Sequence, residues 1–165
     1  AALWALPVLF VCENNRYAMG TALERHQAQT DLALKARSYA IEAEQVDGMD
    51  VEAVAAAARR AVENVRGSGR PHFLEMLTYR FRAHSMFDPE LYRSKAEVDQ
   101  WRKRDPISNY DARLVGRGWL DDARRKAISD AVDGEIDEAI AFADAGTLEP
   151  ISDLAKDVTT PRGTS

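Results

Sequence analysis

Two short, mostly apolar runs constrain the fold of this chain more than any other feature. Residues 8–12 lie between Pro7 and a polar stretch that begins at Glu13, and residues 73–78 follow Pro71. Apolar runs of this length are typical of strands buried on both faces of a parallel sheet. We therefore expect an α/β fold with a parallel sheet.

A weaker strand and a helix fit between these two runs. Residues 41–46 can form a short strand that ends in a turn at residues 47–50. Apolar residues then recur at helical spacing from Val51 to Val65, with Asp50 placed to cap the helix and a glycine-rich stop at residues 66–69. The order strand, crossover, strand, helix, strand predicts parallel pairing.

The rest of the chain predicts a loop and three helices. Residues 85–93 show no periodicity and read as a long loop of the kind that often carries function. A capping box of Ser94 and Glu97 begins a helix through Arg104, and Asp105 with Pro106 begins another that ends at residues 116–118. The longest helix spans about 121–145. Its apolar face consists of Ile128, Val132, Ile136, Ala139, Ile140 and Ala143.

These patterns predict three parts: an α/β domain at 1–93, a helical extension at 94–158 and a flexible tail at 159–165. The chain begins without Met inside an apolar stretch, so we expect a piece of a longer protein.

Composition excludes several classes of function. Of 165 residues, 45% are hydrophobic and 30% are charged, which favours a folded protein over a disordered one. The net charge of -5 argues against binding to nucleic acid or to an anionic membrane. The one cysteine, Cys12, cannot form an internal disulfide, which favours a reducing compartment, and we expect it to be a small buried side chain.

Candidate functional residues follow the first and third predicted strands, because ligands of open α/β sheets bind beyond the carboxyl ends of strands. Asn14 and Asn15 offer neutral oxygen atoms suited to Mg²⁺ bound to phosphate, although the same pair is also common in turns. Arg80, Arg82 and His84 alternate after the third strand and could hold a phosphate or a carboxylate. A solvated rim is the equally open alternative.

Other residues of chemical interest predict structural roles. His26 and His72 lack charged companions in sequence and are expected at the surface or in packing. We expect Asp47 and Asp50 to serve the turn and the cap. Trp4, Trp101 and Trp119 are expected to be packing or interface residues.

Three segments in order resemble one enzyme family. They are VCENNRYAMGT at 11–21, VDGMD at 46–50 and TYRFRAHSM at 78–86, the last followed by Asp88-Pro89 and Tyr92-Arg93-Ser94. They resemble the alpha subunits of thiamine-diphosphate-dependent 2-oxo-acid dehydrogenases of the pyruvate dehydrogenase type, over residues 1 to about 157. The resemblance implies a thiamine-diphosphate-binding fold and oxidative decarboxylation of pyruvate with acetyl transfer to lipoamide.

The resemblance also implies roles for individual residues. Asn15 through its side chain and Tyr17 through its backbone carbonyl would bind the Mg²⁺ that holds the cofactor diphosphate. His84 would be the catalytic residue beside the cofactor, and Arg80 would support the cofactor-binding loop. Ser85 matches a serine that is phosphorylated in eukaryotic members.

Parts of the family's site are missing from this chain. The metal site of the family also uses an aspartate from an upstream Gly-Asp-Gly turn, and the glutamate that activates the cofactor belongs to the beta subunit. We therefore expect the C-terminal part of an alpha subunit that is inactive alone.

The implied partners are a beta subunit, in an assembly of two alpha and two beta subunits, and the lipoyl domain of an acyltransferase. Composition favours a bacterial cytoplasm, with the mitochondrial matrix as the alternative. Two other functions stay open: an acetoin or branched-chain 2-oxo-acid dehydrogenase, and a non-catalytic truncated module that only packs against a beta subunit.

Overall fold

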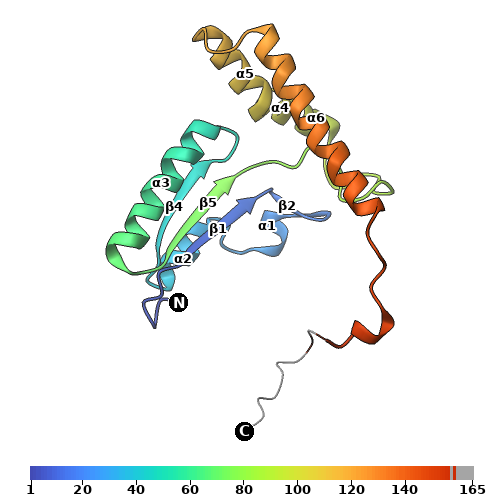
Figure 1. Ribbon diagram of the computed structural model, residues 1–165. Coiled ribbons are helices and arrows are strands. Elements are labelled where there is room, and N and C mark those ends of the chain that lie inside the picture. Colours follow the sequence, from blue (N-terminus) through green and yellow to red (C-terminus); the bar gives the residue numbers. More distant parts are fainter. Residues whose placement is uncertain (157, 159–165) are drawn as a thin grey trace. The chain divides into compact units, whose positions relative to one another are not determined.

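The computed structural model describes residues 1–156 and residue 158. The chain divides into two compact units, Ala1–Arg117 and Gly118–Ser165. The sheet, its covering helices and the candidate site all belong to the first unit (Figure 1).

Three parallel strands form the sheet of the first unit. They are β1 (Leu9–Asn14), β4 (Glu42–Asp47) and β5 (His72–Leu77), in the order β1-β5-β4. The register places Asn14 and Asp47 on either side of Leu77, so the three strands end at one edge of the sheet. The predicted parallel α/β sheet is confirmed, with small shifts of the strand ends.

Helix α2 (Leu32–Ser38) covers one face of this sheet. Asp31 caps it by accepting a hydrogen bond from the Leu34 backbone N–H. Ala33 and Ala36 then pack with Ala43 of β4 in a buried cluster. The sequence patterns did not predict this helix, because its seven residues provide only two turns of periodicity.

Helix α3 (Val51–Ser68) covers the opposite face, as Figure 1 shows. His72 of β5 contacts Asn64 of α3, whereas Glu75 contacts Ala33 of α2, and residues three apart on a strand point to opposite faces. The predicted cap is confirmed, because Asp50 accepts from two backbone N–H groups of the first turn. Gly69 ends the helix with a φ of 65°.

Strand β1 is less buried than its sequence predicts. Phe10 is 39% exposed and Val11 is 55% exposed, whereas Leu74 and Glu75 of β5 are 1% and 0% exposed. Among the described residues, β1 is an edge strand, and α2 and α3 lie mainly over β4 and β5. Burial on both faces is therefore correct for β5 and wrong for β1.

A small hairpin that the sequence patterns did not predict follows β1. Strands β2 (Tyr17–Ala18) and β3 (Thr21–Ala22) pair antiparallel, and a short helix, α1 (Leu23–His26), follows directly. Met19 in its turn has a φ of 56°, a conformation that side chains other than glycine rarely adopt. The turn therefore lacked its usual sequence signal.

Helices α4 (Lys95–Arg102) and α5 (Pro106–Gly116) complete the first unit at their predicted positions. Ser94 caps α4 by accepting from the Glu97 backbone N–H at 3.1 Å. In a capping box, the Glu97 side chain would also accept from the Ser94 backbone N–H. Here the Glu97 carboxylate accepts from the phenols of Tyr17 and Tyr79 instead. These two hydrogen bonds connect α4 to the residues that follow β1 and β5.

The second unit contains the longest helix, α6 (Asp122–Asp144), and a short 3-10 helix, η1 (Ile151–Asp153). The boundaries of α6 agree with the prediction. Its apolar side chains are nevertheless exposed: Ile128 by 59%, Val132 by 52%, Ile136 by 56% and Ile140 by 54%. Nothing in the described part of this unit covers them.

The predicted tail at 159–165 lies outside the described residues. Among the described helices, none is long and apolar enough to cross a membrane.

Candidate active site

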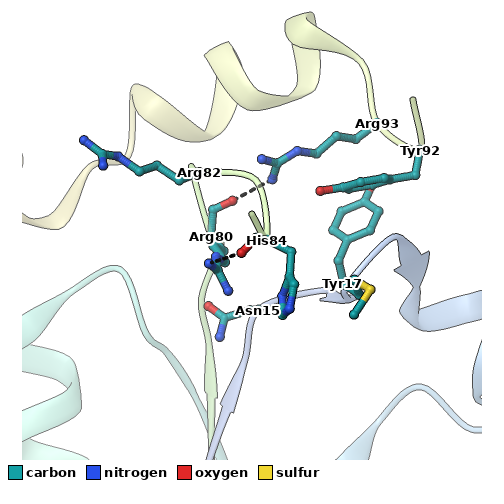
Figure 2. A pocket seen from close by; sticks show the side chains of 8 residues that line it. Asn15, Tyr17, Arg80, Arg82, His84, Tyr92 and Arg93 are labelled. Atoms are coloured by element: carbon teal, nitrogen blue, oxygen red, sulfur yellow. Dashed lines mark hydrogen bonds between the residues drawn. The ribbon is translucent and has the colours of Figure 1, made fainter. Parts of the chain in front are cut away.

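The two strand ends that the sequence singled out meet at one cavity. Asn15 and Tyr17 follow β1, while Arg80 and His84 follow β5, and all four line a small cavity of about 30 Å³. The other lining residues are Met19, Arg82, Tyr92 and Arg93. In Figure 2, the side chains of Arg80 and His84 point toward Asn15, whereas that of Arg82 points away from it.

Parallel pairing fixes the position of Asn15. The Thr78 backbone N–H donates to the Asn14 carbonyl at 3.0 Å and so extends the β1–β5 ladder beyond the strands. The Thr78 hydroxyl then donates to Asn15 Oδ1 at 2.9 Å. Because a carbonyl oxygen has two lone pairs, this bond orients the Asn15 oxygen and leaves capacity for a second partner.

The turn after Asn15 places the Tyr17 backbone. Arg16 has a φ of 70°, and its N–H donates to Asn14 Oδ1 at 3.1 Å. The Arg16 carbonyl accepts from the Leu23 N–H at 2.9 Å, which fastens the turn to the hairpin. These bonds hold a left-handed conformation that arginine does not favour.

The Tyr17 side chain is committed to a structural contact. Its hydroxyl donates to the Glu97 carboxylate, 2.9 Å from Oε1 and 3.1 Å from Oε2. The ring contacts the rings of Tyr92 and Tyr79, with centroids 5.4 Å and 6.2 Å away. Burial, followed by the hydrogen bond to Glu97, raises the pKa of Tyr17 to about 12. The phenol therefore stays protonated near neutral pH.

The loop between β5 and α4 has no helix or strand, yet one buried arginine organises it. The Arg93 side chain is 3% exposed and donates to the carbonyls of Arg80 at 2.6 Å and Phe81 at 3.0 Å. Figure 2 shows the first of these bonds, together with that from Arg80 to the His84 carbonyl at 3.4 Å. Arg93 also forms an ion pair with Glu90. The loop thus presents its side chains on an ordered backbone.

Asp88 fixes the segment that carries His84. Its carboxylate accepts from the His84 backbone N–H at 3.2 Å and from the Tyr92 hydroxyl at 2.9 Å. The Glu90 backbone N–H, followed by the Tyr92 hydroxyl and the His84 backbone N–H, holds the pKa of Asp88 below its ordinary value. The His84 imidazole itself makes no hydrogen bond within the described residues, so it is available to a ligand.

The cavity suits an anion and offers part of a metal site. Arg80 points toward Asn15 and supplies positive charge, which favours a phosphate or a carboxylate. Arg82 points away from Asn15 and Arg93 is paired with Glu90, so the expected grouping of Arg82 with Arg80 and His84 is wrong. Asn15 Oδ1 and the Tyr17 carbonyl are neutral oxygens of the kind that Mg²⁺ accepts, but Mg²⁺ prefers about six ligands. Among residues 1–156 and 158, no three His, Cys, Asp or Glu side chains gather to complete such a site.

The structure also places the remaining candidates. His26 is exposed, His72 is 4% exposed, and Trp101 stacks on Tyr79 with ring centroids 5.0 Å apart. Trp4 and Trp119 are exposed by 76% and 60%. Cys12 is half-buried, and burial with the nearby carboxylates raises the pKa of its thiol, which fits an unreactive side chain.

Three residues that hydrogen-bond to the candidate site residues or their neighbours were not predicted to do so. Thr78 and Glu97 contact Asn15 and Tyr17 directly, and Glu75 contacts Asn14. An acidic residue inside an apolar strand run was a usable signal for Glu75. No local pattern marks the other two, because their partners lie 63 and 80 residues away in sequence.

The fold and the cavity belong to a known class of protein. Residues 1–152 match the family described as "Dehydrogenase E1 component", so the chain belongs to this family.

Three similar curated proteins are named as alpha subunits of a pyruvate dehydrogenase E1 component. The chain is 48% identical to "Pyruvate dehydrogenase E1 component subunit alpha" of Rhizobium meliloti (strain 1021), over 96% of this chain and 46% of that protein. It is 40% identical to the protein of that name from Rickettsia conorii, over 93% of this chain and 47% of that protein. It is also 40% identical to the testis-specific mitochondrial form of this subunit from Rattus norvegicus, over 94% of this chain and 40% of that protein. The chain thus spans less than half the length of these relatives.

Proposed function

We propose that this chain supplies the C-terminal part of the alpha subunit of a thiamine-diphosphate-dependent pyruvate dehydrogenase. The observation that carries the proposal is the meeting of Asn15 and Tyr17 with Arg80 and His84 at one cavity. Pyruvate is preferred over acetoin or a branched-chain 2-oxo acid because the similar proteins are named for pyruvate dehydrogenase.

Each residue has a role in this proposal. Asn15 Oδ1 and the Tyr17 carbonyl bind the Mg²⁺ that anchors a diphosphate, and other parts of the protein complete its coordination. Arg80 holds the loop backbone through the carbonyls of Ala83 and His84. The bound cofactor would supply a carbanion-stabilising centre, and His84 would donate a proton or a hydrogen bond through an imidazole nitrogen beside it.

The proposal includes the setting of the enzyme. The sheet is part of a thiamine-diphosphate-binding fold, and a beta subunit completes the active site in an assembly of two alpha and two beta subunits. The lipoyl domain of an acyltransferase accepts the acetyl group. Because several of the most similar proteins are bacterial, a bacterial cytoplasm is favoured over a mitochondrial matrix.

Two variants test the assignment in the full-length gene product that carries this sequence, co-produced with its beta subunit. Asn15→Ala should weaken Mg²⁺-dependent binding of thiamine diphosphate by at least about tenfold in calorimetry. His84→Ala should keep cofactor affinity and lower kcat by about 100- to 10,000-fold.

Matched controls use residues of the same type away from the cavity. Asn109→Ala and His26→Ala, both at exposed positions, should bind and turn over like the wild type. Unchanged affinity in Asn15→Ala would remove the metal assignment, and unchanged turnover in His84→Ala would remove the catalytic one. A gene product with no activity and no cofactor binding would instead support the non-catalytic assembly module.

A further inference from the structure

Glu75 is an acidic residue in the middle of the sheet, and the proposed function assigns it no role. The residue is 0% exposed and lies on the middle strand β5, between Cys12 of β1 and Gln45 of β4. Burying a carboxylate is costly unless hydrogen bonds satisfy it, and an apolar side chain would suit a sheet core better. The position therefore calls for a role beyond packing.

Both carboxylate oxygens of Glu75 accept hydrogen bonds from separate elements. Asn14 Nδ2 donates to Oε1 at 2.7 Å. The Ala33 backbone N–H and Gln45 Nε2 donate to Oε2, each at 3.1 Å. The side chain thus joins the end of β1, the start of α2 and the neighbouring strand β4.

The bond to Asn14 determines which way the Asn14 amide faces. Only the NH₂ end of a carboxamide can donate to a carboxylate, so the oxygen end must face away from Glu75. That oxygen, Oδ1, accepts the Arg16 backbone N–H at 3.1 Å. If the amide were reversed, two N–H donors would face each other at the turn.

This turn is the one that presents the proposed metal ligands. The left-handed φ of 70° at Arg16 is unfavourable for a residue with a side chain and depends on such support. Asn15 precedes Arg16 and Tyr17 follows it, so a change at Arg16 moves the Tyr17 carbonyl relative to Asn15 Oδ1.

We propose that Glu75 is a positioning residue for the metal site: through the Asn14 amide, its carboxylate holds the turn that aims Asn15 Oδ1 and the Tyr17 carbonyl at one divalent cation. This inference rests on the proposed function. It adds a buried residue that does not line the cavity to the determinants of metal affinity.

The test uses the full-length gene product with its beta subunit, titrated with Mg²⁺ at a fixed concentration of thiamine diphosphate. Glu75→Leu removes the acceptor and should raise the apparent Kd for Mg²⁺ by about tenfold, the size of effect that outer partners of metal ligands have. At saturating Mg²⁺ and cofactor, kcat should stay within about twofold of the wild type, because the reacting groups are intact. Glu75→Gln keeps the shape and should change the Kd in the same direction by less.

A double-mutant cycle separates this role from general stabilisation. Asn14→Ala should also raise the Kd by about tenfold, and the double variant should raise it no further, because Glu75 acts through Asn14. Additive losses, about a hundredfold together, would overturn the proposal. If Glu75→Leu does not fold, the same cycle is run with Glu75→Gln.

Two controls change the same region without touching Asn14. Leu74→Ala removes a side chain that is 1% exposed on the opposite face, and Gln45→Leu removes one of the other donors to Glu75. Both should lower the unfolding temperature and leave the Mg²⁺ Kd unchanged. If Leu74→Ala also raises the Kd for Mg²⁺, then destabilising this region is enough to weaken Mg²⁺ binding, and the proposal is overturned.

The result for Asn15→Ala separates failure of the proposed function from failure of the positioning role of Glu75. If Asn15→Ala loses Mg²⁺ affinity and Glu75→Leu does not, the positioning role is wrong and the proposed function stands. If Asn15→Ala binds Mg²⁺ like the wild type, both are wrong.

Discussion

Gly48 lies where β4 turns away from β5, and a side chain at this position would collide with the residue that holds Asn15. A Cβ atom on Gly48 would lie 2.5 Å from Thr78 Cγ2 and 2.9 Å from the Leu77 carbonyl oxygen. Gly48→Ala should therefore displace Thr78, cost about 1–3 kcal/mol of unfolding free energy, and weaken Mg²⁺-dependent cofactor binding. Denaturant titration and calorimetry measure the two effects.

Gly134→Ala is the matched control, since a Cβ there meets no atom within 4 Å. It should leave binding unchanged and should not destabilise the protein, because alanine favours helix over glycine. Equal stability of Gly48→Ala and the wild type would contradict the close approach described above.

The Tyr17 phenol should lose its proton only at high pH. Because the folded protein raises its pKa from 10.0 to about 12, the stability gained from the protonated phenol is complete below pH 10 and is lost as the pH rises toward 12. In an ultraviolet absorbance titration, Tyr17→Phe should remove a phenol that ionises at high pH. Glu97→Gln should move the Tyr17 titration to lower pH. An unchanged titration curve in Tyr17→Phe would contradict this.

At this scale, the sequence anticipated residues that follow strands but not the residues that support them. Asn15 and His84 could be found because polar groups after buried strands mark the binding edge of a sheet. Thr78 and Glu97 could not, since hydrogen bonds between distant segments depend on the fold and leave no local pattern.

Helix α3 and helix α5 are joined by charges at the start of α3. Arg113 donates to Asp50 at 3.0 Å and to Glu52 at 2.7 Å, and Arg117 contacts Glu52 at 2.5 Å. The bond from Arg113, followed by the cap bond from Ala53, lowers the pKa of Asp50. The capping carboxylate therefore also holds α5 against the first turn of α3.

Asp50→Ala should destabilise the protein by about 1 kcal/mol through loss of the cap, whereas Asp50→Asn should keep the cap and cost less. Because the pKa of Asp50 is lowered in the folded state, its contribution is present above pH 3.8 and is lost as the pH falls below that value. Arg113→Met should reduce this acid sensitivity, and Arg59→Met, at an exposed position on α3, should not. Denaturant unfolding at several pH values measures the effect. Identical acid profiles for the two variants would refute the link.

Periodic elements were predictable, but their environment was not. The helical spacing of α3 and α6 and the apolar run of β5 are local properties, so their boundaries could be inferred. Whether β1 or α6 is buried depends on which distant segments pack over it, and a local pattern does not contain that information. The expected burial of Phe10 was wrong for this reason. The hairpin after β1 was missed because its turn uses Met19 rather than glycine in the left-handed position.

For the molecule as a whole, the first unit contains both halves of the candidate cavity. The chain spans less than half of its curated relatives, and the described residues offer Mg²⁺ two proposed oxygen ligands out of the about six it prefers. In the proposed site, the remaining ligands would be diphosphate oxygens, water and other parts of the protein.

The 165-residue chain produced alone should expose apolar surface that favours self-association. Phe10 and Val11 on β1, and the stripe of Ile128, Val132, Ile136 and Ile140 on α6, are all substantially exposed among the described residues. Apolar patches of this kind bind hydrophobic dyes and promote association. Val132→Lys should reduce dye fluorescence and the sedimentation coefficient of the isolated chain. Ala141→Lys adds the same charge to α6 at an exposed position that is not three or four residues from any member of that stripe, and it should change neither. Equal effects of the two lysines would attribute any improvement to net charge rather than to the apolar stripe.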